Sequence, residues 1–99
     1  MARASHGIYD DGLFEWDRRK AASNNDKHGL SFEEAALTFF DPNALEVDDV
    51  AHSSRENRVK RLGRALGGKI LMVVYTLRGG EDGRQEKVRI ISARVAHRK

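Results

Sequence analysis

The chain has 99 residues, of which 39% are hydrophobic and 33% charged, and it contains no cysteine. This length suits one domain with a modest core, and the lack of cysteine excludes disulfides and thiolate metal sites. The longest apolar run, Ile70 to Tyr75, is too short to cross a bilayer, and the N-terminus lacks the apolar segment of a signal peptide. We therefore expect a soluble cytoplasmic protein that makes no membrane contact.

Charge is distributed unevenly along the chain. Residues 1–54 carry five Lys/Arg and eleven Asp/Glu, a net charge of −6, whereas residues 55–99 carry thirteen and four, a net charge of +9. A basic region of this kind attracts a polyanion such as RNA or DNA. The same charges also fit strands that are only solvated by their side chains, and charge alone does not separate the two interpretations.

The N-terminal region divides into a leader and the start of a domain. Residues 1–12 contain glycines and aspartates without an apolar period, which predicts a flexible leader before a single domain over 13–99. Residues 13–16 are apolar and aromatic, which favours a short strand with Phe14 and Trp16 in the core.

Two helices are expected next. Asp17 is a suitable N-cap for a helix over 18–27, and Gly29 supplies the residue that ends it. Ser31 and Glu34 form a capping box at the start of a second helix. The apolar face of the second helix comprises Phe32, Ala35, Ala36 and Phe39.

From Arg55 onward the apolar period changes to two, which is typical of strands. Residues 44–50 before it fit either a short strand or a loop. The expected strands cover residues 59–66, 69–77 and 86–93. Helices followed by an antiparallel meander predict an α+β fold, with the N-terminal helices packed on the sheet.

Gly67-Gly68 predicts a two-residue hairpin turn in which Leu66 pairs with Lys69. This register predicts which side chains share a face of the sheet. One face would hold Arg58, Lys60, Leu62, Arg64, Leu71, Val73, Tyr75 and Leu77, and the other Ile70, Met72, Val74, Thr76 and Arg78.

Five residues are candidates for catalysis on a phosphodiester. Arg78 and Arg94 each follow a strand, and a guanidinium binds phosphate through paired hydrogen bonds and can stabilise a phosphorane-like transition state. Glu56 could act as a general base or orient Arg58 by a salt bridge. His28 could transfer a proton, although a cation at that helix end also serves the helix dipole. Each arginine also fits an ordinary surface ion pair.

Three further basic strand residues, Lys60, Arg64 and Arg89, are assigned to RNA binding, together with Tyr75, whose ring could stack on a base or lie in the core. No metal or other cofactor is expected, because the histidines are scattered and His52 with Glu56 is only a weak i, i+4 pair.

The order of these motifs resembles the BrnT-type ribonuclease toxins. The resemblance covers about residues 13 to 96. It is carried by Phe14-Glu15-Trp16-Asp17, Lys20, Asn24, Lys27-His28-Gly29, Ser31-Phe32-Glu33-Glu34-Ala35, Phe40-Asp41-Pro42, Glu56-x-Arg58, Gly63, Val73-Val74-Tyr75-Thr76-x-Arg78 and Arg89-Ile90-Ile91-Ser92-Ala93-Arg94.

The resemblance implies a RelE-like fold and a metal-independent endoribonuclease that inhibits translation. It also implies a BrnA-like antitoxin with a ribbon-helix-helix part. The toxin would contact operator DNA only through this antitoxin. Such toxins usually continue into a C-terminal helix, whereas this sequence ends at Lys99. Two alternatives remain: a non-catalytic basic module that binds nucleic acid, and a scaffold that only binds the antitoxin.

Overall fold

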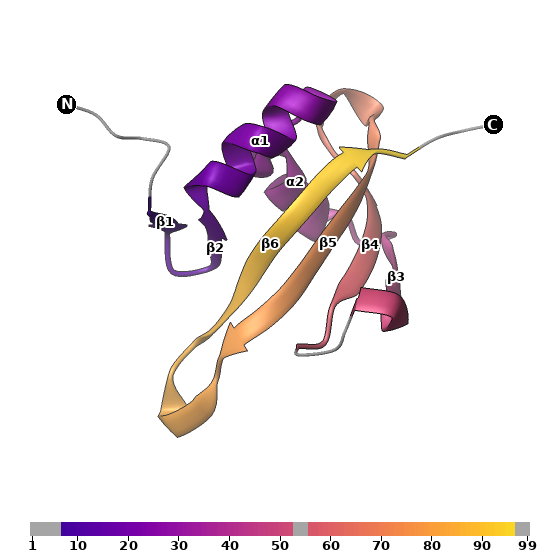
Figure 1. The fold of residues 1–99 in the computed structure, drawn as a ribbon. Helices are drawn as coiled ribbons and strands as arrows, with labels where there is room; N and C mark the ends of the chain where they lie inside the picture. Colours follow the sequence, from indigo (N-terminus) through magenta and orange to yellow (C-terminus); the bar gives the residue numbers. More distant parts are fainter. Residues whose placement is uncertain (1–6, 53–55, 97–99) are drawn as a thin grey trace.

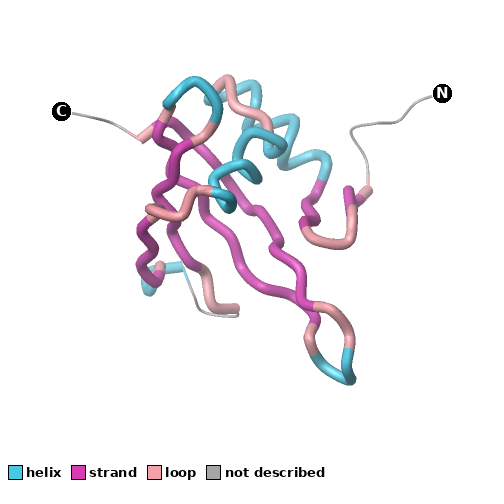
Figure 2. Tube along the Cα trace, turned by 180° about the vertical axis from the view of Figure 1, so that it is seen from behind, coloured by secondary structure: helices cyan, strands magenta, loops and turns pink. Residues whose placement is uncertain are grey.

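A computed structural model describes residues 7–52 and 56–96. Within them, six strands form one sheet in the order β1-β2-β6-β5-β4-β3. The strands are β1 Ile8–Asp10, β2 Phe14–Asp17, β3 Leu45–Asp48, β4 Val59–Arg64, β5 Ile70–Gly79 and β6 Glu86–Val95. Helices α1 (Arg18–His28) and α2 (Phe32–Leu37) lie on one face of the sheet (Figure 1, Figure 2), which confirms the α+β class.

The predicted helix ends are confirmed. The Asp17 carboxylate accepts hydrogen bonds from the backbone N–H groups of Arg19 and Lys20, and Gly29 ends α1 with φ 67°. The residue that ends the helix there adopts the left-handed backbone conformation, which glycine reaches without the steric clash that a Cβ atom would cause. The Ser31 capping box begins α2, which continues as a 3-10 turn over Thr38–Phe40.

The core lies between the helices and the central strands. Leu30, Phe32, Leu71, Val73 and Ile90 are almost completely buried in it. The expected core residues Phe14 and Trp16 also belong to this cluster. This packing leaves the other face of β4, β5 and β6 without a helix over it among the described residues.

The register of the β4–β5 hairpin differs from the predicted one by one residue. Arg64 pairs with Ile70, and the Ala65 N–H donates to the Lys69 carbonyl at 2.8 Å. The predicted pairing of Leu66 with Lys69 is therefore wrong, because the loop has three residues, Leu66–Gly68.

This shift exchanges the faces of β4. Lys60, Leu62 and Arg64 now share the open face with Ile70, Met72 and Val74, while Val59, Arg61 and Gly63 join Leu71, Val73 and Tyr75 on the helix side. Gly63 explains the choice of register. A Cβ at Gly63 would lie 2.8 Å from the Thr38 Cβ, so only glycine fits beneath the 3-10 turn.

The N-terminal region also differs from expectation. Residues 8–10 of the expected leader form β1, antiparallel to β2, whereas residues 1–6 lie outside the described residues. β2 pairs in parallel with β6, so β6 occupies an interior position of the sheet. The C-terminal helix that the resemblance implies would follow β6, and residues 97–99 also lie outside the described residues.

Candidate active site

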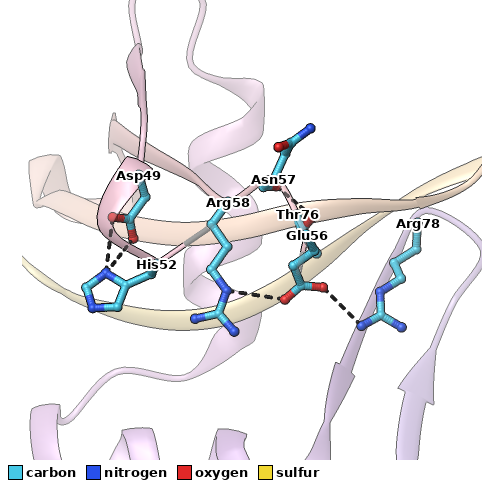
Figure 3. A network of polar contacts seen from close by, with 7 residues as sticks. All are labelled: Asp49, His52, Glu56, Asn57, Arg58, Thr76 and Arg78. Carbon is cyan, nitrogen blue, oxygen red and sulfur yellow. Dashed lines mark hydrogen bonds and ion pairs between the residues drawn. The ribbon is translucent and has the colours of Figure 1, made fainter. Parts of the chain in front are cut away.

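Glu56 brings two of the predicted arginines together. Its carboxylate accepts a hydrogen bond from Arg58 Nε at 3.2 Å and another from Arg78 Nη2 at 3.3 Å. Glu56 and Arg58 precede β4, and Arg78 lies near the end of β5. Figure 3 shows the carboxylate between the two guanidinium groups, each bound to a different oxygen. One carboxylate therefore holds two positive groups at one edge of the open face.

Backbone contacts fix the segment that carries Glu56. The Thr76 hydroxyl, buried in β5, donates to the Asn57 carbonyl at 2.8 Å. The Asp49 N–H donates to the Arg58 carbonyl at 2.8 Å. These bonds attach the start of β4 to β5 on one side and to the turn after β3 on the other.

That turn carries an Asp–His pair which the sequence analysis did not identify as catalytic. Asp49 precedes the 3-10 turn Val50–His52 and His52 is its last residue, and His52 Nδ1 lies 3.1 Å and 3.2 Å from the two Asp49 carboxylate oxygens. Asp49 is 5% exposed, whereas the His52 side chain is 65% exposed. The only sequence signal was the i, i+3 spacing of Asp49 and His52, which places two side chains on one side of a 3-10 turn.

Arg58, Lys60 and Arg94 meet in a hollow on the open face. The hollow has a volume of about 250 Å³. Its lining residues are Asp49, His52, Arg58, Lys60, Met72, Val74, Ile91, Ser92 and Arg94. Arg94 reaches it from β6, where it pairs with Met72 of β5. Three cationic side chains and an imidazole around a small hollow suit a phosphodiester group.

His28 lies apart from this hollow. It is exposed at the C-terminal end of α1 and lines a larger hollow of about 1020 Å³ with Lys27, Lys69 and Arg94. Arg94 therefore belongs to both hollows, while His28 is not among the residues that line the one holding Arg58. The structure brings together Glu56, Arg58 and Arg78, and joins Arg94 to Arg58, but leaves His28 on the far side of Arg94.

The residues assigned to RNA binding occupy different environments. Lys60 lines the hollow. Arg64 is exposed at the end of β4, where its backbone N–H donates to the Asp41 carboxylate. The guanidinium of Arg89 donates to Glu15 at 2.9 Å, so its charge is balanced by a neighbouring strand.

Tyr75 lies in the interior rather than on the open face. It is 7% exposed, and its hydroxyl donates to Glu46 at 2.6 Å. Burial and this hydrogen bond raise the pKa of Tyr75 well above its usual value. Its ring packs edge-on against Phe39. This position gives Tyr75 a structural role instead of a base-stacking one.

No described helix is long and apolar enough to span a membrane. Across residues 7–52 and 56–96, no three His, Asp or Glu side chains gather in a way that could hold a metal ion.

Comparison with known proteins gives the family. Residues 16–99 match the family described as ribonuclease toxin, BrnT, of type II toxin-antitoxin system. The chain belongs to the BrnT family. The crystal structure of the Brucella abortus ribonuclease toxin BrnT has the same fold, with a TM-score of 0.60 and 25% sequence identity, over 84% of this chain and 94% of that one. No curated protein matches the chain significantly.

Membership in the BrnT family makes this chain a ribonuclease toxin of a type II toxin–antitoxin system, with RNA as substrate and an antitoxin as partner. The resemblance seen in the sequence is thereby confirmed at the level of family and fold.

Proposed function

We propose that this BrnT toxin is a metal-independent endoribonuclease of the mRNA interferase type, which cleaves RNA in the cytoplasm and so inhibits translation. The observation that carries the proposal is the convergence of Arg58 and Arg78 on Glu56, with Arg94 lining the same hollow as Arg58. Guanidinium groups bind the scissile phosphate and stabilise the charge of its transition state without a metal ion.

In this mechanism the ribose 2′-hydroxyl attacks the adjacent phosphorus, which leaves a 2′,3′-cyclic phosphate and a 5′-hydroxyl. Arg58, Arg78 and Arg94 bind the phosphate oxygens. Each guanidinium has five N–H donors in a planar fork, so it can serve a carboxylate and a phosphate together. Glu56 holds two guanidinium groups in place, which favours a positioning role over that of general base.

His28 was the other group expected to transfer a proton. It lines the neighbouring hollow with Arg94, so a role at the leaving oxygen stays a prediction. Lys60 and Arg64, which share the open face, would track the RNA backbone on either side of the cleaved bond. Arg89 would contribute less, because Glu15 balances its charge.

For the partner, we propose a BrnA-like antitoxin with a ribbon-helix-helix part, as the family resemblance implies. The toxin would reach operator DNA only through this antitoxin. A partner that neutralises the toxin must block access to the basic open face, directly or by burying its edge.

The test is cleavage of a defined RNA by the purified, refolded chain in EDTA, both free and on translating ribosomes. We expect 2′,3′-cyclic phosphate ends, and we expect Arg78→Ala to lower the rate at least about 100-fold with an unchanged fold, by loss of transition-state charge stabilisation. Arg19→Ala, an exposed arginine on α1, is the matched control and should cleave normally.

Inactivity of the wild-type chain on both substrates would contradict the proposal. If RNA is bound and shifted but left intact, the chain is a binding module. If cells grow normally when it is expressed without antitoxin, the chain acts only as a scaffold.

A further inference from the structure

The Asp49–His52 pair has the chemistry of a proton-transfer group. Both carboxylate oxygens of Asp49 lie within 3.2 Å of His52 Nδ1. A carboxylate only accepts hydrogen bonds, so Nδ1 carries the proton in the neutral imidazole. The lone pair of that tautomer is therefore on Nε2, on the side of the ring turned away from Asp49 (Figure 3). A buried carboxylate that fixes the tautomer and orientation of an exposed histidine is the arrangement found in hydrolytic triads.

The surroundings of His52 place this imidazole where a phosphodiester would bind. Arg58 lies between His52 and Glu56 in Figure 3, and His52 lines the same hollow as Arg58, Lys60 and Arg94. The charged groups that face this hollow are the carboxylate of Asp49, in the turn after β3, and three cations. The cations are Arg58 just before β4, Lys60 in β4 and Arg94 in β6. Asp49 orients the ring and lies beside the positive charge that forms when Nε2 accepts a proton.

We propose that His52 is the general base of the ribonuclease reaction and that Asp49 is its positioning residue. This inference rests on the proposed function. His52 Nε2 takes the proton of the 2′-hydroxyl as the 2′-oxygen forms its bond to phosphorus. The bond from phosphorus to the 5′-oxygen breaks, the leaving oxygen takes a proton from water, and the imidazolium later returns its proton to solvent.

The other two candidates fit this role less well. Both oxygens of Glu56 bind guanidinium groups, so its carboxylate is engaged in positioning Arg58 and Arg78. His28 lines a different hollow and lies on a different element, so it is not placed beside Arg58. His52 alone among the three is both oriented by a carboxylate and placed in the hollow with Arg58.

The experiment compares single-turnover cleavage by the wild type, His52→Ala and Asp49→Asn across pH, with Asp26→Asn on exposed α1 as the matched control for the loss of one carboxylate. We expect His52→Ala to be at least about 100-fold slower and to lose the rise in rate with pH that titration of a base produces. Added imidazole should restore part of its rate. Asp49→Asn should lower the maximal single-turnover rate about tenfold or more, with the half-saturating enzyme concentration unchanged, because it disturbs the tautomer and orientation of His52.

A substrate with a 5′-bridging sulfur distinguishes a general base from a general acid. Sulfur leaves without protonation, so a missing general acid is rescued by this substrate and a missing general base is not. We expect the His52→Ala defect to persist on it. Rescue by the sulfur substrate, or wild-type rates in His52→Ala while Arg78→Ala is inactive, would overturn the role of His52 and leave the proposed function intact.

Imidazole rescue seen for His28→Ala instead of His52→Ala would overturn it as well. An inactive wild-type chain would overturn the proposed function and the role of His52 together. Circular dichroism and thermal unfolding of each variant show whether a loss of rate comes from the chemistry or from the fold.

Discussion

Tyr75 illustrates how one side chain depends on the strand that carries it. Its hydroxyl donates to Glu46 of β3 at 2.6 Å, and the same carboxylate oxygen accepts from Arg61 of β4 at 2.7 Å. Arg61 in turn lies over the Phe39 ring. Tyr75, Glu46 and Arg61 therefore connect three strands on the helix side of the sheet, so Tyr75 serves the stability of the sheet.

This contact predicts a pH dependence of stability. Burial and the bond to Glu46 raise the pKa of Tyr75, whereas the unfolded tyrosine titrates near its ordinary value of about 10. Above that pH the unfolded chain loses a proton that the native protein keeps, so stability falls as pH rises. Tyr75→Phe should cost about 1.5 kcal/mol at neutral pH and should show a shallower alkaline loss in urea titrations between pH 9 and 11.

Tyr9→Phe is the matched control. The Tyr9 hydroxyl donates to Asp11 at 2.9 Å near the surface, and this bond raises the pKa of Tyr9 without comparable burial. Its removal should change the alkaline slope less than removal of the Tyr75 hydroxyl. Parallel stability curves for the wild type and Tyr75→Phe above pH 10 would contradict the assignment.

At the scale of elements, α1 is attached to the sheet by a single buried amide. Asn24 Nδ2 donates to the Ala93 carbonyl at 2.8 Å and to the Leu30 carbonyl at 3.3 Å, and its Oδ1 accepts from the Ala93 N–H at 3.1 Å. Few apolar side chains of α1 face the core, so these bonds position the helix against β6.

Asn24→Ala should therefore destabilise the protein by about 2–3 kcal/mol, because it leaves buried backbone groups of Ala93 without a partner. The neighbouring Asn25→Ala is the matched control: that side chain is exposed, and alanine favours the helix, so stability should stay the same or rise slightly. Chemical denaturation measures both. Equal stability of the two variants would show that α1 is held by other contacts.

The elements differ in how far they could be predicted. Both ends of α1 and the start of α2 followed from Asp17, Gly29 and Ser31, because capping depends on residues within one turn. The β4–β5 register did not follow from Gly67-Gly68, because glycine pairs suit both two- and three-residue loops, and the packing of Gly63 against Thr38 decides between them.

The site was predictable only in part for the same physical reason. Arginines at strand ends could be identified from the strands, and two of the three arginines assigned to the phosphate, Arg58 and Arg78, meet at Glu56. The Asp49–His52 pair could not be recognised as part of the site from the sequence. Its place in the site depends on a turn that brings it beside Arg58, and no local sequence pattern specifies that contact.

At the scale of the whole molecule, residues 55–99 have a net charge of +9, and two of their cations, Lys60 and Arg64 of β4, lie on the side that the helices leave open. The acidic half contributes β1, β2, the helices and β3. Its first two strands supply partners for the basic half: Asp10 of β1 for Lys87 and Glu15 of β2 for Arg89.

This distribution predicts salt-dependent RNA binding. The logarithm of the binding constant should fall linearly with the logarithm of salt concentration, with a slope of about −0.7 for each phosphate contact to a single strand. Lys60→Ala should reduce the slope by about 0.7, whereas Arg19→Ala on the acidic half should leave it unchanged. Fluorescence anisotropy with a 2′-O-methyl RNA measures both without cleavage, and identical slopes for the wild type and Lys60→Ala would exclude Lys60 from the interface.

The interior position of β6 has a consequence for the cell that makes this toxin. β6 is synthesised after every other strand, yet it is the strand that joins β2 and α1 to β5 and contributes Arg94 to the hollow. A ribosome-bound chain lacking β6 has neither a continuous sheet nor a complete site. The activity of the toxin therefore requires synthesis of the whole sheet through β6.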